Sequence, residues 1–146
     1  MKDVSRFLSL GKYAIVGVSR DPKKFGQVMF RDLRKKGMDV VPVNPGADTI
    51  DGVKCFRSVS ELPREVKGVI FMTPKEATLP VAREVIAHGI KDLWIQQGAE
   101  TKEVISELEK EDINLIHNQC MLMFWKPNGI HSFHRFLKKI FGGLPA

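Results

Sequence analysis

The segment that most constrains the fold lies near the start of the chain. Residues 13–18 are nearly all apolar, Gly17 allows a tight turn, and a helical pattern of apolar residues runs over 25–37. A second apolar segment follows at 40–43, so the order is buried strand, turn, helix and buried strand. This order is typical of the first unit of a doubly wound parallel sheet, which binds a nucleotide at its first turn.

The first turn differs from the fingerprint of NAD-binding proteins. That fingerprint is G-x-G-x-x-G with an acidic residue about 20 residues later, which holds a ribose 2′-hydroxyl. Here Gly17 is followed by Ser19 and the basic segment 20–24, and the second strand ends in Asn44-Pro45 without an acid. We therefore expect the unit to bind a phosphorylated nucleotide other than NAD.

Strand and helix patterns continue to alternate along the rest of the chain. Further strands are expected at 53–56, 68–72, 92–96 and 114–117. A capping box at Ser58–Glu61 predicts a brief helical turn, and Thr101 is expected to cap a later helix. Pro80 places the start of another helix near Thr78 or Leu79, because proline is tolerated in the first turn of a helix but not deep inside it.

This alternation predicts an α/β fold with a Rossmann-like, doubly wound parallel sheet of five or six strands. The crossovers should be right-handed, with helices on both faces of the sheet. A length of 146 residues fits a single domain, 1–146, which can bury an ordinary core, here at 10–120.

The C-terminal segment has a different character. Apolar residues between Ile130 and Phe141 share one face of a predicted helix at 130–142, opposite basic residues that include Lys138 and Lys139. Such a helix could lie on a membrane surface. Packing on the sheet, or on a second subunit in a homo-oligomer, is the favoured alternative.

The composition indicates a soluble cytoplasmic protein. Hydrophobic residues make up 43% and charged residues 27% of the chain, and no apolar stretch reaches the roughly 20 residues of a membrane span. The N-terminus lacks the apolar region of a secretory signal, and Cys55 and Cys120 do not form a disulfide framework. The net charge of +6 is spread out, which favours one phosphorylated ligand over nucleic acid.

Several short motifs carry a resemblance to a known family. They are Gly17-Val-Ser19, Lys24-Phe-Gly26, Pro42-Val-Asn44-Pro45, Trp94-Ile-Gln-Gln97-Gly98 and Asn118-Gln-Cys120. Together they resemble the stand-alone coenzyme A-binding domain proteins, which are related to the N-terminal domain of the succinyl-CoA synthetase alpha subunit. The resemblance covers roughly residues 10–120. Family members usually carry Asp-Arg-Cys where this chain has 118–120, so roles of that Asp and Arg do not carry over.

Ligands of such sheets bind beyond the carboxyl ends of the strands, where the strand order reverses. The expected contacts with coenzyme A or an acyl-CoA are Gly17, Val18, Ser19, Arg20, Lys24, Gly26, Asn44, Pro45, Thr73, Pro74, Gln97 and Gly98. The first turn and the following helix N-terminus should hold the pyrophosphate, with charge from Arg20 and Lys24. Asn44 could contact the base or ribose, or form a plain turn. The resemblance implies that 73–74 and 97–98 line the adenine and pantetheine channel, whereas the residues alone indicate simple loops.

The sequence contains little that argues for catalysis. His117 and Cys120 have the spacing of two metal ligands, but a structural zinc needs four, so no metal is expected. Cys120 could face the coenzyme thiol, although a packed thiol is the favoured interpretation. We expect a binding or regulatory module without catalysis of its own. The alternatives are an NAD(P)-binding domain, with Arg20 and Lys24 on a 2′-phosphate, and a basic protein that binds nucleic acid or membrane.

Overall fold

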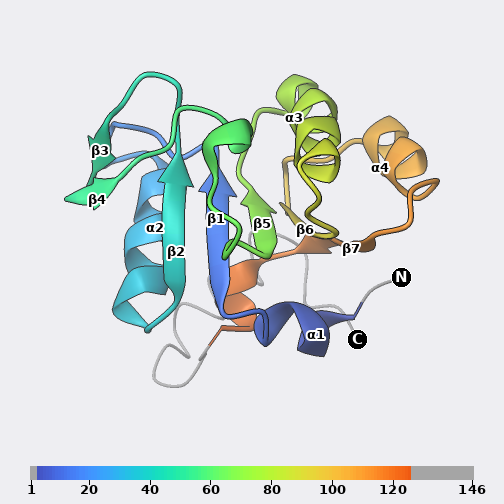
Figure 1. Cartoon of the computed structure of the whole chain (residues 1–146), viewed down its shortest axis with the longest axis horizontal. Helices are drawn as coiled ribbons and strands as arrows, with labels where there is room; N and C mark the ends of the chain where they lie inside the picture. The colour runs from blue at the N-terminus through green and yellow to red at the C-terminus, as the bar shows by residue number, and fades with distance from the viewer. Residues whose placement is uncertain (1–2, 126–146) are drawn as a thin grey trace.

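The computed structural model describes residues 3–125 (Figure 1). Its helices are α1 (Val4–Leu8), α2 (Phe25–Lys35), α3 (Lys75–Ala87) and α4 (Lys102–Leu108), with 3-10 turns η1 (Val59–Glu61) and η2 (Met121–Met123). Its strands are β1 (Lys12–Val16), β2 (Asp39–Val43), β3 (Thr49–Ile50), β4 (Val53–Lys54), β5 (Gly68–Phe71), β6 (Asp92–Gln96) and β7 (Asn114–Gln119). The amphipathic helix expected at 130–142 lies outside the described residues.

Five parallel strands form the central sheet in the order β2-β1-β5-β6-β7 (Figure 1). From β1 the chain adds β2 on one side, then returns and adds the remaining strands on the other side. The strand order therefore reverses between β1 and β5, which makes this the switch point. Outside the central sheet, β3 and β4 form a short antiparallel pair, and a bridge from Val43 to Phe56 connects the segment after β4 to β2. The doubly wound parallel sheet expected from the sequence is confirmed.

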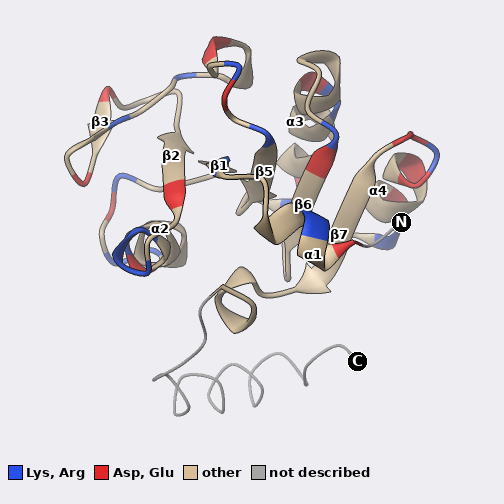
Figure 2. Cartoon of the chain, turned by 60° about the horizontal axis from the view of Figure 1, so that its bottom comes forward, with Lys and Arg blue, Asp and Glu red and all other residues tan. Residues whose placement is uncertain are grey.

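Alternate residues of the central strands build two separate core layers, because successive side chains of a strand point to opposite faces. In β1, Tyr13 and Ile15 belong to one layer and Ala14 and Val16 to the other. The first layer packs under α1 and α2, and the second packs under α3 and α4. Figure 2 shows α2 and the pair α3–α4 on opposite sides of the sheet. The prediction of helices on both faces is confirmed.

Helix α2 begins and ends where the sequence predicts. It buries Met29, Phe30 and Leu33 on one face, and Arg34 and Lys35 are exposed on the other. After the helix, Gly37 adopts a φ of +88°, and the backbone N–H of Met38 donates to the carbonyl oxygen of Leu33 at 3.0 Å. This C-terminal closure fixes the length of α2. Its N-terminus then lies beside the turn that follows β1.

The expected start of the helix around Pro80 is wrong. The helix begins at Lys75 and Pro80 is its sixth residue, so one intrahelical hydrogen bond is missing. Burial of Thr78, Ala82 and Val85 against the sheet offsets that loss. Tertiary packing therefore extends α3 by one turn toward its N-terminus, beyond the point that the proline alone would set.

The predicted capping box is also wrong in its details. The hydroxyl of Ser58 lies 2.8 Å from that of Ser60 and makes no cap bond. Oε1 of Glu61 accepts from the backbone N–H of Arg57 at 3.1 Å, one residue earlier than a capping box requires. The segment nevertheless forms the short turn η1. Within residues 3–125, no helix combines the length and apolar character needed to cross a membrane.

Candidate nucleotide-binding site

The backbones that follow β1 and β5 are in close contact at the switch point. Gly17 has a φ of +89°, and a Cβ on it would lie 2.7 Å from the carbonyl carbon and oxygen of Met72 and 2.9 Å from the nitrogen of Thr73. Side-chain Cβ atoms do not approach backbone so closely. Gly17 is therefore required for the approach of the two strand ends, a reason that the sequence did not reveal, as well as for its left-handed conformation.

The N-terminus of α2 lies directly against this turn. A Cβ on Gly26 would lie 2.8 Å from the carbonyl oxygen of Gly17, so a larger residue would push the helix away. Lys24 is the N-cap residue, and its side chain caps no backbone group. The backbone N–H groups of Phe25 and Gly26 have no acceptor within the described part of the chain. Free N–H groups at a helix N-terminus carry a partial positive charge and attract anions.

Two side-chain amides hold the turn by its carbonyl oxygens. Nδ2 of Asn44 donates to the carbonyl oxygen of Val18 at 2.7 Å, and Nε2 of Gln27 donates to that of Ser19 at 2.9 Å. Because a trans peptide is planar, the N–H groups of Ser19 and Arg20 point away from these amides. Among residues 3–125, neither N–H has an acceptor. The turn therefore presents two free backbone donors beside the N-terminus of α2.

The side chains around the turn are mostly basic. Residues 17–26 contain three cations, including Arg20 and Lys24, and a single acid, Asp21. Oγ of Ser19 accepts from the backbone N–H of Asp21 at 3.0 Å, which leaves the hydroxyl hydrogen available for a ligand. Figure 2 shows basic residues on α2 and along the loop before it. The charge and the free donors both favour an anion at this turn.

The loop after β2 is held by its own hydrogen bonds and by an arginine from further along the chain. Oδ1 of Asn44 accepts from the backbone N–H of Gly46 at 2.7 Å, so both polar atoms of this amide are engaged inside the fold. Arg57 donates to Asp48 at 2.6 Å and to the carbonyl oxygen of Pro45 at 3.5 Å. The carboxylate of Asp48 raises the pKa of Arg57. Arg57 was not predicted from the sequence. Only its position directly after the expected 53–56 strand could have pointed to it.

Arg20 also reaches the loop after β2. Its Nη1 donates to the carbonyl oxygen of Gly46 at 3.3 Å, and its side chain remains exposed. Arg20 thus lies between the first turn and the Asn44-Pro45 corner. A single anionic group could contact this guanidinium and the turn together, because the guanidinium has five donors and uses one of them here.

A buried hydroxyl pair connects the loops after β5 and β6. Oγ1 of Thr78 donates to the carbonyl oxygen of Ala99 at 2.6 Å and lies 2.6 Å from Oγ1 of Thr73. Since Thr78 has one hydrogen to donate, Thr73 is the donor in the second bond. The hydroxyl of Thr73 therefore points into the fold. Pro74 is the N-cap residue of α3, and its ring replaces an N–H that a helix start would leave unpaired.

The loop after β6 is open at Gly98. This glycine is exposed, has a φ of +99°, and would have no atom within 4 Å of a Cβ. The backbone N–H of Gln97 donates to the carbonyl oxygen of Gln119 at 3.2 Å, which attaches the loop to β7. Gly98 is therefore free of the close contacts that make Gly17 and Gly26 necessary, and its role is conformational.

The two residues with the spacing of metal ligands are His117, within β7, and Cys120, directly after it. Cys120 is buried, and burial raises the pKa of its thiol. Nε2 of His117 lies 3.9 Å from Oε1 of Glu109. Within residues 3–125, no group of three or more His, Cys, Asp or Glu side chains could hold a metal ion. A protonated, buried thiol is a poor nucleophile.

The fold thus brings the expected residues to one edge of the sheet, in two groups. One group lies beyond the carboxyl ends of β2, β1 and β5, and consists of the first turn, Asn44-Pro45 and Thr73, which are in contact. The 97–98 loop lies above β6 and is connected to them through Thr78. The doubly wound sheet, with a turn that attracts anions at its switch point, places the chain in the class of nucleotide-binding α/β domains. Within that class, the chain belongs to the CoA binding domain family, whose model matches residues 11–126.

Relatives of the chain include both long and short proteins. It is 35% identical over 133 residues to the alpha subunit of ADP-forming acetate–CoA ligase II from Pyrococcus furiosus, covering 88% of this chain and 29% of that subunit. It is 26% identical over 110 residues to the uncharacterized protein YneT of Bacillus subtilis, covering 75% and 82%. A solved conserved hypothetical protein from Pyrococcus furiosus has a TM-score of 0.74 and 43% identity, covering 77% and 97%. The resemblance to coenzyme A-binding proteins is confirmed.

Proposed function

We propose that the chain binds coenzyme A or an acyl-CoA at the carboxyl edge of its sheet, as a binding or regulatory module without catalysis of its own. The observation that carries the proposal is the turn after β1. Among the described residues, its N–H groups at Ser19 and Arg20 have no acceptor, and Asn44 and Gln27 hold the carbonyl oxygens on the other side of the turn. These donors and the N-terminus of α2 suit a pyrophosphate group.

The length of this edge suits an elongated ligand. Pro45 follows β2, and the side chain of Arg20 reaches the same loop, whereas Gly98 follows β6, which is three strands away. Neighbouring strands are about 4.8 Å apart, so the two ends of the edge are separated by roughly 14 Å. A nucleotide with a long flexible arm can span that distance, with its phosphates at the basic end. Coenzyme A has this shape and charge distribution.

The site supports binding more strongly than chemistry. It offers backbone donors, cations and a hydroxyl, while the thiol of Cys120 is buried with a raised pKa. The matched ligase subunit is a much longer protein, of which this chain covers 29%. Ligase activity of that relative is therefore an alternative for this chain, to be tested by assaying thioester formation from acetate, coenzyme A and a nucleoside triphosphate.

Calorimetric titration of the full-length protein with coenzyme A, NADP and a short oligonucleotide tests the proposal. We expect saturable binding of coenzyme A that is tighter than that of either other ligand. Lys110→Ala is the matched control, because Lys110 is an exposed lysine in the loop between α4 and β7, at the opposite edge of the sheet. It should leave coenzyme A affinity unchanged. Tighter binding of NADP or oligonucleotide would contradict the proposal.

A further inference from the structure

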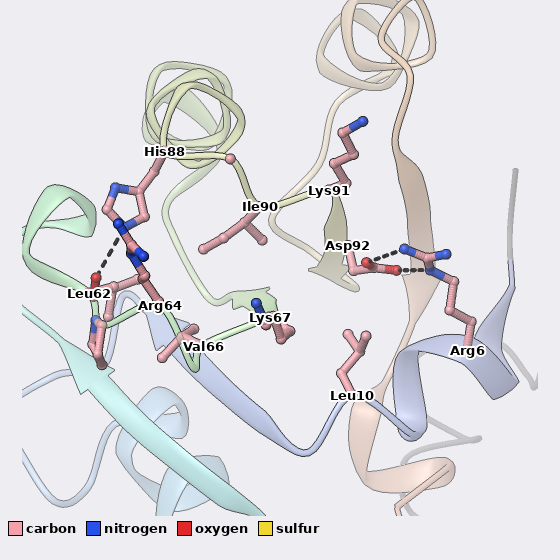
Figure 3. A pocket seen from close by; sticks show the side chains of 12 residues that line it. Arg6, Leu10, Leu62, Arg64, Val66, Lys67, His88, Ile90, Lys91 and Asp92 are labelled. Atoms are coloured by element: carbon pink, nitrogen blue, oxygen red, sulfur yellow. Dashed lines mark hydrogen bonds and ion pairs between the residues drawn. The ribbon is translucent and has the colours of Figure 1, made fainter.

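A cavity lies at the amino-terminal edge of the sheet, opposite the candidate nucleotide site. Its volume is about 490 Å³, within the range of small-molecule sites. It is lined by the loop before β5, the loop between α3 and β6, and α1 with the segment after it (Figure 3). None of these segments contributes to the turn after β1.

The floor of this cavity is apolar and preformed. Leu62, Val66 and Ile90 line it, and each is packed into the core with 6% or less of its surface exposed. Leu10 closes one side and is partly buried. The wall beside Leu62 is fixed because Nε2 of His88 lies 3.0 Å from the carbonyl oxygen of Leu62, a contact drawn in Figure 3. An apolar group could therefore enter without rearrangement of the floor.

The one acid that lines the cavity is neutralised by its neighbours. Asp92 is buried and accepts from Nε and Nη2 of Arg6 at 2.9 and 3.1 Å (Figure 3). It also accepts from Nδ2 of Asn114 at 3.0 Å. The hydrogen bond and charge of Asp92 raise the pKa of Arg6. Because this carboxylate is paired, it does not oppose a negative charge elsewhere in the cavity.

Two cations at the cavity are not paired. Arg64 and Lys67 are exposed, and among residues 3–125 neither makes an ion pair. Lys91 also lines the cavity, but its Nζ lies 4.0 Å from a carboxylate oxygen of Asp112. Glu65, between the two free cations in sequence, does not line the cavity. The lining therefore has two available positive charges beside an apolar floor.

We propose that this cavity binds a small organic anion with an apolar body, such as a medium-chain carboxylate. The body would lie on Leu62, Val66 and Ile90, and the anionic group would contact Arg64 and Lys67. Because Asp92 is paired, its negative charge does not oppose the binding of such an anion. This site is separate from the coenzyme site, because the two lie at opposite edges of the sheet.

The test is an NMR titration of the full-length protein with sodium hexanoate, read from backbone amide shifts. Saturable shifts are expected at Val66, Lys67, Gly89 and Ile90. Acetate has the same charge without the apolar body, and hexanamide has the body without the charge. The affinity of each should be lower than that of hexanoate by about tenfold or more. Equal binding of acetate would show that the site takes an ion only, and would overturn the proposal.

Charge reversal locates the anion. Lys67→Glu should weaken hexanoate binding by about fivefold or more, and so should Arg64→Glu. Lys102→Glu, at an exposed position that begins α4, should change nothing. Saturating coenzyme A should leave the hexanoate shifts intact, because the two sites are separate. This expectation does not depend on whether coenzyme A binds at the turn after β1. Absence of saturable shifts at the cavity, or equal losses in all three variants, would overturn the proposal.

Discussion

The side chain of Asn44 donates to the carbonyl oxygen of Val18 at 2.7 Å and so joins the end of β2 to the turn after β1. Its Oδ1 accepts from the backbone N–H of Gly46, so the amide has both a donor and an acceptor role. An aspartate has no N–H to offer, and its oxygen would face a carbonyl oxygen. The identity of this residue therefore controls the shape of the turn as well as its charge.

We predict that Asn44→Asp lowers the free energy of unfolding by about 1–3 kcal/mol, the usual cost of leaving a part-buried group unsatisfied. Urea denaturation monitored by circular dichroism measures this difference. Coenzyme A affinity should fall as well, because the N–H groups of the turn lose their orientation. Unchanged stability together with unchanged affinity would show that the bond to Val18 does not matter.

Gly17 and Gly11 form a matched pair, with φ values of +89° and +92°. Both substitutions to alanine carry a similar backbone cost of roughly 1–2 kcal/mol, because at positive φ the new Cβ crowds the following carbonyl oxygen. Only at Gly17 does the new Cβ also meet backbone atoms at 2.7 Å, whereas Gly11 has nothing within 4 Å. We predict that Gly17→Ala is the more destabilising substitution by a further 1–3 kcal/mol or so. Equal losses in thermal denaturation would contradict the close approach.

Arg20→Ala and Lys24→Ala should each weaken coenzyme A binding by about tenfold or more, since charge-assisted hydrogen bonds contribute roughly 1.5–3 kcal/mol. Dephospho-coenzyme A separates the possible contacts. If the substituted side chain contacts the 3′-phosphate, its loss should weaken binding of dephospho-coenzyme A less than binding of coenzyme A. If it contacts the pyrophosphate, its loss should weaken binding of both ligands equally. Calorimetry with both ligands makes the comparison. If neither substitution changes either affinity, the phosphates bind elsewhere.

Thr78→Val replaces a buried hydroxyl with a methyl group of similar size. The carbonyl oxygen of Ala99 and the hydroxyl of Thr73 would both lose their partner. We predict a loss of about 1–3 kcal/mol in the free energy of unfolding. Thr101→Ala, which removes the cap of α4, is a useful reference, with an expected loss of about 1 kcal/mol. A Thr78→Val protein as stable as the wild type would exclude a structural role for the hydroxyl pair.

Burial raises the pKa of the Cys120 thiol, and that of Cys55 likewise. The protonated forms are favoured in the folded state, so their stabilising contribution is full below the unfolded thiol pKa of about 8.5 and is lost as pH rises through the folded values. We predict that stability falls less steeply above that pH in a Cys55→Ala, Cys120→Ala double variant. Tyr13, whose pKa burial also raises, remains in both proteins as a common background.

The five strands of the central sheet could be predicted because each is a short apolar segment followed by a turn residue, whereas the short strand β3 was not predicted. The start of α3 could not, since it depends on burial of Thr78 and Ala82 against a sheet that the local sequence does not contain. At the site, the positions of Gly17 and Asn44 were predicted but their reasons were not. The donor and acceptor of the Asn44–Val18 bond are 26 residues apart, a distance over which no local pattern carries information.

The two amides that shape the first turn come from later in the chain than the turn itself. A fragment or nascent chain that ends at Lys35 contains the glycine turn and Gln27 but lacks Asn44. Its turn would be free to sample other shapes, and the edge strand β2 would be missing from its place beside β1. We therefore expect the N–H groups of the turn to be fixed in orientation toward an anion only once β2 has docked. A bound nucleotide would in return hold this edge strand in the sheet and protect it from fraying.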